Sequence, residues 1–325
     1  MSLLDRYRRP IEQGLRSVLR GETQLAEILR YHVGLSAEDV TPSKLGKLIR
    51  PGLVLFTAEE LGGRIDAALP AAVGLELIHG FSLIHDDVQD RDETRRGRPA
   101  VWVRWGIAEA INAGDLMHAI GLRTALDAGA GAARTLAEAT AEMIEGQSLD
   151  LAFEGRFVTV DEYVAMIDRK TGALFRCAFE LGGRCAQVGA EVLGKLAEIG
   201  ANIGRAFQLQ DDLLGIWGDG DTIGKPIGSD VRRKKKSYPV VVAYATASES
   251  ERERLERIYA AATIAEPDAK WVIALLDRLE VADRTCEAVR EYSERASKAV
   301  GRVSLSDDGK RELLEMIEHL TRRET

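Results

Sequence analysis

Residues 69–90 constrain the fold most, because apolar side chains recur there at every third or fourth position. One helical stripe is formed by Val73, Leu77, Ile84 and Val88. Further apolar residues between them make the other faces of the same helix apolar as well. A helix that is apolar on all sides is buried at the centre of a bundle. The segment therefore predicts a central helix.

The same helical period continues along most of the chain. It predicts further long helices over residues 109–126, 132–153, 160–180, 190–216 and 270–299. With only 8 prolines, no Asn-Gly turn and no regular strand spacing, a β architecture is not expected. Glycines and prolines, including those at 97–99, mark helix ends rather than domain linkers. We predict an all-α bundle with a single domain over residues 1–325, in which the charged segment after Ala247 forms peripheral helices.

Composition narrows the class of protein. The chain has 325 residues, with 44 Lys or Arg against 52 Asp or Glu, and its net charge of −8 argues against binding nucleic acid through bulk charge. The basic run 232–236 is read as a solvated face, with a nucleic-acid patch as the alternative. Three widely spaced cysteines favour a reduced, cytoplasmic location. We expect no signal peptide and no integral membrane segment.

Two apolar segments end in clusters of carboxylates. The string DDVQD places Asp86 and Asp90 about 6 Å apart on one helical face, with Asp87 beside them. Carboxylates at a helix C-terminus oppose the helix dipole, so this arrangement calls for a cation; the alternative is a solvated helix end. Asp211 and Asp212 end a second apolar helix, where the alternative is a frayed helix end. Oxygen ligands of this kind suit magnesium.

Cationic residues follow or precede these acidic ends in four short blocks. The blocks supply Lys47 and Arg50, Arg95 and Arg96, Lys170 with Thr171, and Lys225 with Lys235. Separate acidic and basic sets suit a phosphorylated substrate, whose oxygens accept charge-assisted hydrogen bonds from Lys and Arg. Each block alone could equally be a solvated face. Neither a P-loop nor a dinucleotide-binding GxGxxG motif occurs, and His79 and His85 can be core residues.

Taken in order, these residues resemble the trans-isoprenyl diphosphate synthases, or polyprenyl synthetases. The resemblance is carried by seven blocks: GKLIRP, IHGFSLIHDDVQDRDETRRGRP, NAGD, EGQSLDL, DRKTGALF, FQLQDDLLGIWGD and GKPIGSDVRRKKKSYP. It implies an isoprenoid synthase-type helical bundle around a deep central cavity, commonly homodimeric, in which the two aspartate-rich motifs face each other.

The resemblance also implies roles for individual residues. Asp86, Asp90 and Asp211 would bind magnesium, with about three ions expected per site, while Asp87 and Asp212 would hold coordinated water. Isopentenyl diphosphate would be bound by Lys47, Arg50, His79 and Arg96. The allylic diphosphate would be bound by Arg95, Lys170, Lys225 and Lys235, with Thr171 and Gln208 near the reacting carbons. His85 keeps its interpretation as a core residue.

The implied activity is a prenyl transfer. Isopentenyl diphosphate would condense head-to-tail with an allylic diphosphate (dimethylallyl, geranyl or farnesyl) after ionisation of the allylic carbon–oxygen bond. The alternatives are a terpene cyclase of the same fold and a non-catalytic regulatory subunit of a prenyl synthase. Phe81 and Ser82 stand at the positions that set product length in the family, which favours geranylgeranyl diphosphate, followed by farnesyl diphosphate.

One position departs from the family pattern. The second acidic motif usually carries a third aspartate four residues after the first, where this chain has Gly215. We expect that Asp219, one helical turn further on, partly replaces it if the helix continues that far. The product, the primer, the pathway served and the oligomeric state cannot be derived from the sequence alone.

Overall fold

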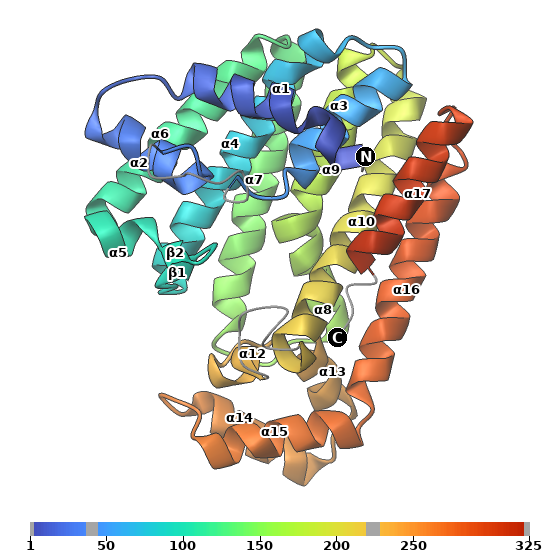
Figure 1. Cartoon of the computed structure of the whole chain (residues 1–325). Helices are drawn as coiled ribbons and strands as arrows, with labels where there is room; N and C mark the ends of the chain where they lie inside the picture. Colours follow the sequence, from blue (N-terminus) through green and yellow to red (C-terminus); the bar gives the residue numbers. More distant parts are fainter. Residues whose placement is uncertain (1–2, 37–44, 219–227, 322–325) are drawn as a thin grey trace. The chain divides into compact units, whose positions relative to one another are not determined.

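The structure is a computed structural model that describes residues 3–36, 45–218 and 228–321. Apart from two short strands, the regular structure of these residues is helical (Figure 1), which confirms the predicted all-α class. The chain divides into two compact units. Unit 1 comprises Met1–Thr140, Arg176–Ala197 and Val303–Glu312, and unit 2 comprises Ala141–Phe175, Glu198–Arg302 and Leu313–Thr325. That residues 1–325 make a single domain stays a prediction.

Unit 1 contains the N-terminal helices and a small hairpin. Its elements are α1 (Leu3–Val18), α2 (Gln24–Val33), α3 (Ile49–Glu60), α4 (Ile65–Gln89), β1 (Thr94–Arg95), β2 (Arg98–Pro99), α5 (Val101–Trp105) and α6 (Ile107–Leu126), with the first part of α7 (Ala130–Phe153) and most of α9 (Ala173–Cys185).

Helix α4 is the central helix of unit 1. It packs against α1, α3 and α6, and Figure 1 shows α4 and α6 side by side. Val73 and Leu77 from one predicted stripe, and Leu75 and Ile78 from the other faces, are each at most 2% exposed. Burial of each such side chain contributes about 1.5–3 kcal/mol to folding. The prediction of a central helix from its all-round apolar surface is confirmed.

The apolar composition of α4 has a second possible meaning. Among the described residues, α4 is the one helix long and apolar enough to cross a membrane. However, 67% of its apolar window is buried inside the protein. Burial in the core of unit 1 therefore accounts for this composition without a lipid environment.

A short hairpin follows α4 where the sequence indicated only a helix end. Strands β1 and β2 pair antiparallel, with Arg95 opposite Arg98. The two residues between them, Arg96 and Gly97, have φ of 52° and 70°. A two-residue turn of type I′ needs positive φ at both positions, which glycine adopts without strain and arginine rarely does. The hairpin thus holds Arg95 and Arg96 on a rigid turn rather than on a loose loop.

Unit 2 contains the second half of the chain. Its elements are the end of α7, α8 (Val160–Ile167), the π-helix η2 (Asp168–Gly172), most of α10 (Ala190–Trp217), α12 (Ser229–Arg232), α13 (Tyr238–Thr246), α14 (Glu249–Ala260), α15 (Glu266–Arg278), α16 (Val281–Val300) and the end of α17 (Asp307–Thr321).

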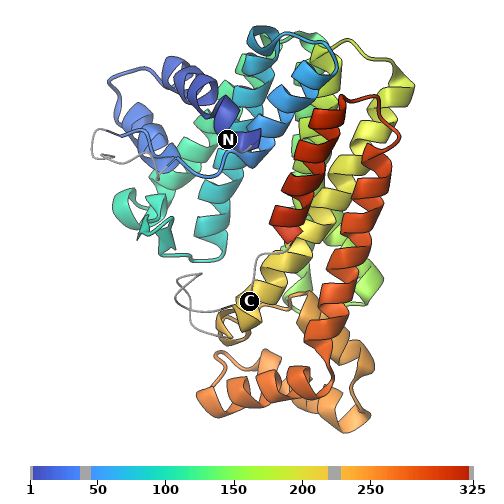
Figure 2. The ribbon, with the colours of Figure 1, turned by 45° about the vertical axis from the view of Figure 1, so that its right-hand side comes forward.

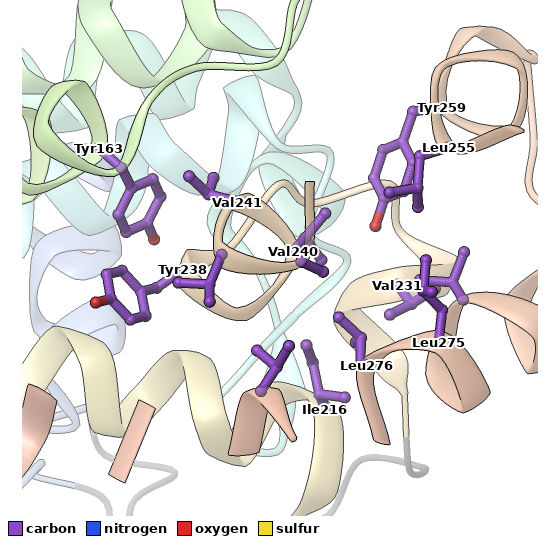
Figure 3. Packing of buried hydrophobic residues seen from close by; sticks show 14 of the residues in the cluster. Tyr163, Ile216, Val231, Tyr238, Val240, Val241, Leu255, Tyr259, Leu275 and Leu276 are labelled. Atoms are coloured by element: carbon purple, nitrogen blue, oxygen red, sulfur yellow. The ribbon is translucent and has the colours of Figure 1, made fainter. Parts of the chain in front are cut away.

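The core of unit 2 is built around α13. Val240 and Val241 are fully buried there, and Leu255 of α14 and Leu276 of α15 belong to the same cluster (Figure 3). Figure 2 shows α14 and α15, in orange, at one end of this unit. The expectation that the segment after Ala247 is only peripheral is therefore wrong in part. Its helices expose a charged face, but their apolar face is part of the core.

One predicted helix is two helices. The segment 270–299 breaks between α15 and α16, where Glu280 has φ of 52° and precedes the first residue of α16. Neither glycine nor proline marks this break, so the sequence pattern did not indicate it. The reversal lets both helices pack against α13.

Candidate active site

The first acidic helix end lies at the C-terminus of α4, in unit 1. Asp86 is partly exposed and Asp90, the C-cap residue, is exposed, whereas Asp87 is only 1% exposed. Arg95 on β1 donates to Asp87 Oδ1 through Nε at 2.9 Å and forms an ion pair with it. Burial nevertheless raises the pKa of Asp87. The two consecutive aspartates are therefore not equivalent: one faces outward and the other is a buried anchor for Arg95.

A cationic group lies in the same unit, on the segment before α3 and on the hairpin. Gly46 has φ of 39°, and a Cβ at this position would lie 2.8 Å from an Nη atom of Arg96. Glycine at 46 therefore makes room for the Arg96 guanidinium. Lys47 follows it and is exposed, and Leu48 is buried with φ of 52°. The left-handed turn at Leu48 starts α3 directly before Arg50.

His79 joins this group from the middle of α4. Arg50 Nη1 lies 3.2 Å from His79 Nε2, and because arginine can only donate, Nε2 must accept. The other ring nitrogen, Nδ1, lies 3.7 Å from Glu76 Oε2, and Glu76 is 6% exposed. Burial and the neighbouring Arg50 lower the pKa of His79 to about 4. His79 is therefore a neutral imidazole, with its proton on the side of Glu76.

Glu76 was missed by the sequence reasoning. Burial alone would raise its pKa, but His79, Arg96 and Arg50 together lower it, so the carboxylate stays charged. It supplies a buried negative charge among cations from α3 and the hairpin. The available signal was a charged residue three positions before His79 on an otherwise apolar helix.

The residues predicted to limit product length lie one turn before the acidic end. Phe81 is 6% exposed, and its ring contacts His85 and His118 with centroid distances of 5.6 and 5.0 Å. Ser82 donates to the carbonyl of His79 at 2.9 Å, a bond within α4. His118, on α6, was not singled out from the sequence. The Phe81 ring is thus held by contacts from α6 as well as from its own helix.

The block DRKTG forms a π-helix in unit 2, between α8 and α9. Such π-helical turns are rare and frequently occur at functional sites. A capping box at Thr159 and Glu162 starts α8. Lys170 forms an ion pair with Asp150 of α7.

The π-helix is held between the backbones of two other helices. A Cβ at Gly146 of α7 would lie 2.2 Å from the amide nitrogen of Lys170. A Cβ at Gly204 of α10 would lie 2.7 Å from Cα of Gly172. The glycine in the block EGQSLDL therefore serves close packing, which fixes the segment that carries Lys170 and Thr171.

A buried polar network joins this π-helix to the second acidic helix end. Thr171 Oγ1 donates to Gln208 Oε1 at 2.7 Å, and Gln208 Nε2 donates to Asp212 Oδ1 at 3.1 Å. Asp212 is fully buried, and its other oxygen accepts from the Tyr163 hydroxyl and from the Tyr238 amide. Figure 3 shows both tyrosines at the edge of the apolar core. The network fixes the positions of Thr171 and Gln208 that the resemblance assigned to the reacting carbons.

Lys235 completes this end of unit 2. Its Nζ lies 3.5 Å from Asp212 Oδ1 and 3.7 Å from Asp230 Oδ2. Although partial desolvation opposes the charge, these carboxylates raise the pKa of the Lys235 side chain, which is 45% exposed, so it stays cationic. Burial raises the pKa of Asp212, while Asp211 beside it is partly exposed. The second acidic end thus repeats the first: one outward aspartate and one buried aspartate paired with a cation.

The structure brings most of the predicted residues together within each unit. In unit 1 these are Asp86, Asp87 and Arg95 at one end of α4, and Arg50, His79 and Arg96 along it. In unit 2 they are Lys170, Thr171, Gln208, Asp212 and Lys235. Asp219 and Lys225 lie outside the described residues.

The donors at both helix ends suit the magnesium ions that the resemblance implies. They are carboxylate oxygens, and Asp87 Oδ2 is a buried oxygen without a hydrogen-bond partner among the described residues. Within the same described part of the chain, no three His, Cys, Asp or Glu side chains are grouped closely enough to hold a metal. Magnesium is commonly held by one or two carboxylates together with substrate phosphates, which fits this arrangement.

Comparison with known proteins identifies the family. The family described as "Polyprenyl synthetase" matches residues 36–276. A (2E,6E)-farnesyl diphosphate synthase of Mycobacterium tuberculosis is 46% identical over 228 residues, which cover 68% of this chain and 64% of that protein. The geranylgeranyl diphosphate synthase of the same species is 39% identical over 260 residues, covering 78% of this chain and 74% of that one.

A solved structure agrees over nearly the whole chain. The polyprenyl synthetase of Streptomyces coelicolor A3(2) is 34% identical, with a TM-score of 0.89 and 98% of both chains covered. The chain belongs to the polyprenyl synthetase family, and its fold is the predicted isoprenoid synthase type. It spans about 64% of the length of the farnesyl diphosphate synthase it matches.

Proposed function

We propose that the chain is a trans-prenyltransferase that condenses isopentenyl diphosphate head-to-tail with an allylic diphosphate. The observation that carries this proposal is the repeated arrangement at the two acidic helix ends. At each, an outward aspartate adjoins a buried one that holds a cation: Asp87 with Arg95, and Asp212 with Lys235. At each helix, the outward aspartate is left to bind a metal ion. The cation paired with the buried aspartate stays close enough to bind a phosphorylated ligand.

The basic group of unit 1 suits the non-allylic substrate. Arg50, Arg96 and the exposed Lys47 can donate charge-assisted hydrogen bonds to a diphosphate. His79 can donate none from Nε2, because this atom accepts from Arg50, so we propose that it orients Arg50. The buried charge of Glu76 offsets these cations when no ligand is bound.

The reaction needs stabilisation of negative charge on the leaving diphosphate. Breaking the allylic carbon–oxygen bond leaves diphosphate and an allylic cation, and we assign Arg95, Lys170, Lys225 and Lys235 to the diphosphate. Magnesium, when bound by Asp86, Asp90 and Asp211, supplies further charge stabilisation, with Asp87 and Asp212 supporting coordinated water. Thr171 and Gln208 would lie beside the cation, where their fixed dipoles need no reorganisation.

The carbon–carbon bond then forms between the cation and the double bond of isopentenyl diphosphate. Positioning both substrates in an apolar environment favours this reaction over attack by water. Loss of a proton gives the longer allylic diphosphate, and the departing diphosphate is the proposed acceptor. No side chain is assigned as base.

Product length is proposed to be set by Phe81 with Ser82. An aromatic ring supported by His118 blocks further growth, while the small Ser82 leaves space beside it. We propose geranylgeranyl diphosphate as product, with farnesyl diphosphate as the second choice. The names of the two mycobacterial relatives cover both lengths.

We also propose a cytoplasmic homodimer. The three cysteines are free thiols, as a reducing compartment requires. Ile107 and Ile111, one turn apart on α6, are 53% and 45% exposed, an apolar pair that a second copy would cover. Ile111→Arg should shift the sedimentation coefficient towards that of a monomer, and an unchanged coefficient would exclude this face.

The decisive test is incorporation of labelled isopentenyl diphosphate. The purified chain with magnesium and dimethylallyl, geranyl or farnesyl diphosphate should form longer prenyl diphosphates. Asp86→Ala and Asp211→Ala should lower the rate by about three orders of magnitude or more while circular dichroism stays helical, since partly exposed carboxylates are lost without loss of core packing. Near-normal rates in either variant would refute the metal assignment.

The same assay separates the alternatives. A terpene cyclase would release diphosphate from the allylic substrate alone, without incorporating isopentenyl units. A regulatory subunit would do neither by itself, but would change the rate of an added synthase.

A further inference from the structure

Two arginines contact the backbone of Gly46, the residue directly before Lys47. Nη1 of Arg8, on α1, donates to the Gly46 carbonyl at 3.2 Å. The Arg96 guanidinium packs on the other side, where a Cβ at Gly46 would lie 2.8 Å from Nη2 of Arg96. The residue before Lys47 is therefore held through its carbonyl from α1 and through its Cα from the hairpin.

Helix α1 is itself fastened to α3, the helix that follows this segment. The two helices pack against each other (Figure 1). The buried Tyr7 donates its hydroxyl proton to Glu59 Oε2, near the C-terminal end of α3. Arg6 Nη1 lies 3.4 Å from the same oxygen, and Arg6 also forms an ion pair with Glu312 of α17. Since Tyr7 and Arg8 are consecutive, one turn of α1 holds the end of α3 and the backbone just before its start.

The segment between Gly46 and α3 transmits this restraint to Lys47. Only Lys47 and Leu48 separate Gly46 from α3, which begins at Ile49. Glycine is the residue with the most backbone freedom to lose, so an unrestrained Gly46 would leave the direction of Lys47 undefined. A hydrogen bond from a charged donor is about twice as strong as one between neutral groups. The bond from Arg8 is therefore suited to fix the carbonyl of Gly46, and with it the start of the Lys47 backbone.

We propose that Arg8 is a positioning residue of the isopentenyl diphosphate site, which acts through the Gly46 carbonyl to place Lys47. The inference rests on the proposed function, because that function assigns Lys47 to this substrate. A side chain that is placed before binding loses less conformational freedom when the ligand arrives, which increases affinity. The allylic diphosphate is assigned to other cations, so its binding should depend little on Arg8.

The experiment measures binding of isopentenyl diphosphate by calorimetry in the full chain. Arg8→Met keeps an apolar stem but removes the donor, and should weaken binding about tenfold, which is about the cost of ordering one long side chain. The KM of the primer should change by less than about threefold. Arg8→Lys keeps a cationic donor and should bind within about threefold of the wild type. Arg9→Met, at the exposed neighbouring position, removes the same charge and should bind like the wild type.

A double-mutant cycle tests whether Arg8 acts through Lys47. In a Lys47→Ala chain, Arg8→Met should weaken binding by no more than about threefold further, because the side chain that Arg8 places is gone. A loss of about tenfold in both backgrounds would mean that Arg8 acts independently of Lys47, which overturns the proposal. Wild-type binding by Arg8→Met, no recovery in Arg8→Lys, or an equal loss in Arg9→Met also overturns it.

Urea denaturation separates positioning from a general loss of stability. If Arg8→Met lowers the free energy of unfolding but binds isopentenyl diphosphate like the wild type, its role is structural only and the proposal fails, while the proposed function stands. Because calorimetry needs no turnover, the expected binding pattern in a chain that incorporates no isopentenyl units would refute the proposed function but not the role of Arg8. A wild type that does not bind isopentenyl diphosphate would refute both.

Discussion

Gly146→Ala tests whether the position of the π-helix η2, which carries Lys170 and Thr171, depends on its backbone packing against α7. The added Cβ would lie 2.2 Å from the Lys170 nitrogen and 2.7 Å from its Cα, and ordinary contact begins at 3.4 Å. The Lys170 backbone must therefore move by about 3.4 − 2.2 = 1.2 Å, or α7 must move instead. Both neighbours are backbone atoms, so no side-chain rotation relieves the clash.

The size of this displacement predicts which property changes most. Overpacking costs about 1–3 kcal/mol, and alanine in place of glycine inside a helix returns about 1 kcal/mol. The net loss of stability is thus about 0–2 kcal/mol, which a chain of this size tolerates. A misplacement of about 1 Å at catalytic groups, however, costs about 100-fold in rate. We expect Gly146→Ala to stay folded and to lose about two orders of magnitude in the chemical step.

Single-turnover incorporation of labelled isopentenyl diphosphate measures the rate, and urea denaturation measures the free energy of unfolding. Gly194→Ala is the matched control, because its added Cβ meets nothing within 4 Å. It should keep the wild-type rate and gain a little stability. If Gly146→Ala turns over like Gly194→Ala, the π-helix does not depend on this contact and the assignment of Lys170 and Thr171 to the reacting centre loses its main support.

Lys47→Ala should raise the KM of isopentenyl diphosphate about tenfold or more and change that of the primer by less than about threefold, because a charge-assisted bond is lost at one substrate only; equal changes would contradict the assignment. Phe81→Ala should shift the dephosphorylated products to longer chains on chromatography, and an unchanged distribution would exclude Phe81 as the limit. The pKa of His79 is lowered to about 4, so the unfolded chain takes up a proton at higher pH than the folded chain. The contribution of neutral His79 to the free energy of unfolding is complete above about pH 6.5 and is lost as the pH falls towards 4. Urea midpoints at pH 7 and pH 5 should therefore differ more for the wild type than for His79→Gln.

Local patterns were enough to predict the central helix and both acidic ends. The apolar surface of α4 has a period that only a buried helix satisfies, and Asp86 and Asp211 follow directly from the string of aspartates near the C-terminal end of each helix, although α10 continues to Trp217. Residues 97–99 were recognised as a helix stop, but the hairpin was not, because its turn uses Arg96 at positive φ. Arginine adopts positive φ so rarely that its presence at this position does not predict such a turn.

The π-helix could not be predicted from periodicity. Residues 160–180 have one continuous helical pattern, and the inserted turn at DRKTG changes the phase without changing the composition. Its cause lies in other helices, at Gly146 and Gly204, where the backbones approach closely. A glycine inside a helical pattern indicates close packing only once its neighbour is known.

Three partners of the predicted residues were missed for a related reason. Glu76, Asp150 and Tyr163 each hold a predicted residue, yet each lies in a segment whose pattern indicates only a helix. Tyr163 and Asp212 are 49 residues apart, and only the tertiary fold brings them into contact. Such partners follow from satisfying buried polar groups, which requires knowing which groups are buried.

The difference between the two members of each aspartate pair has a geometric cause. Consecutive helical residues point about 100° apart, so a doublet at the end of a buried helix must turn one carboxylate towards the core when the other faces outward. A buried carboxylate is tolerated only with a cation and further donors. The chain after each helix supplies both, through Arg95 on a hairpin and through Lys235 with the Tyr238 amide. The aspartate doublet therefore binds the cationic segment that follows it as well as offering a ligand, and so couples the position of the basic residues to that of the acidic ones.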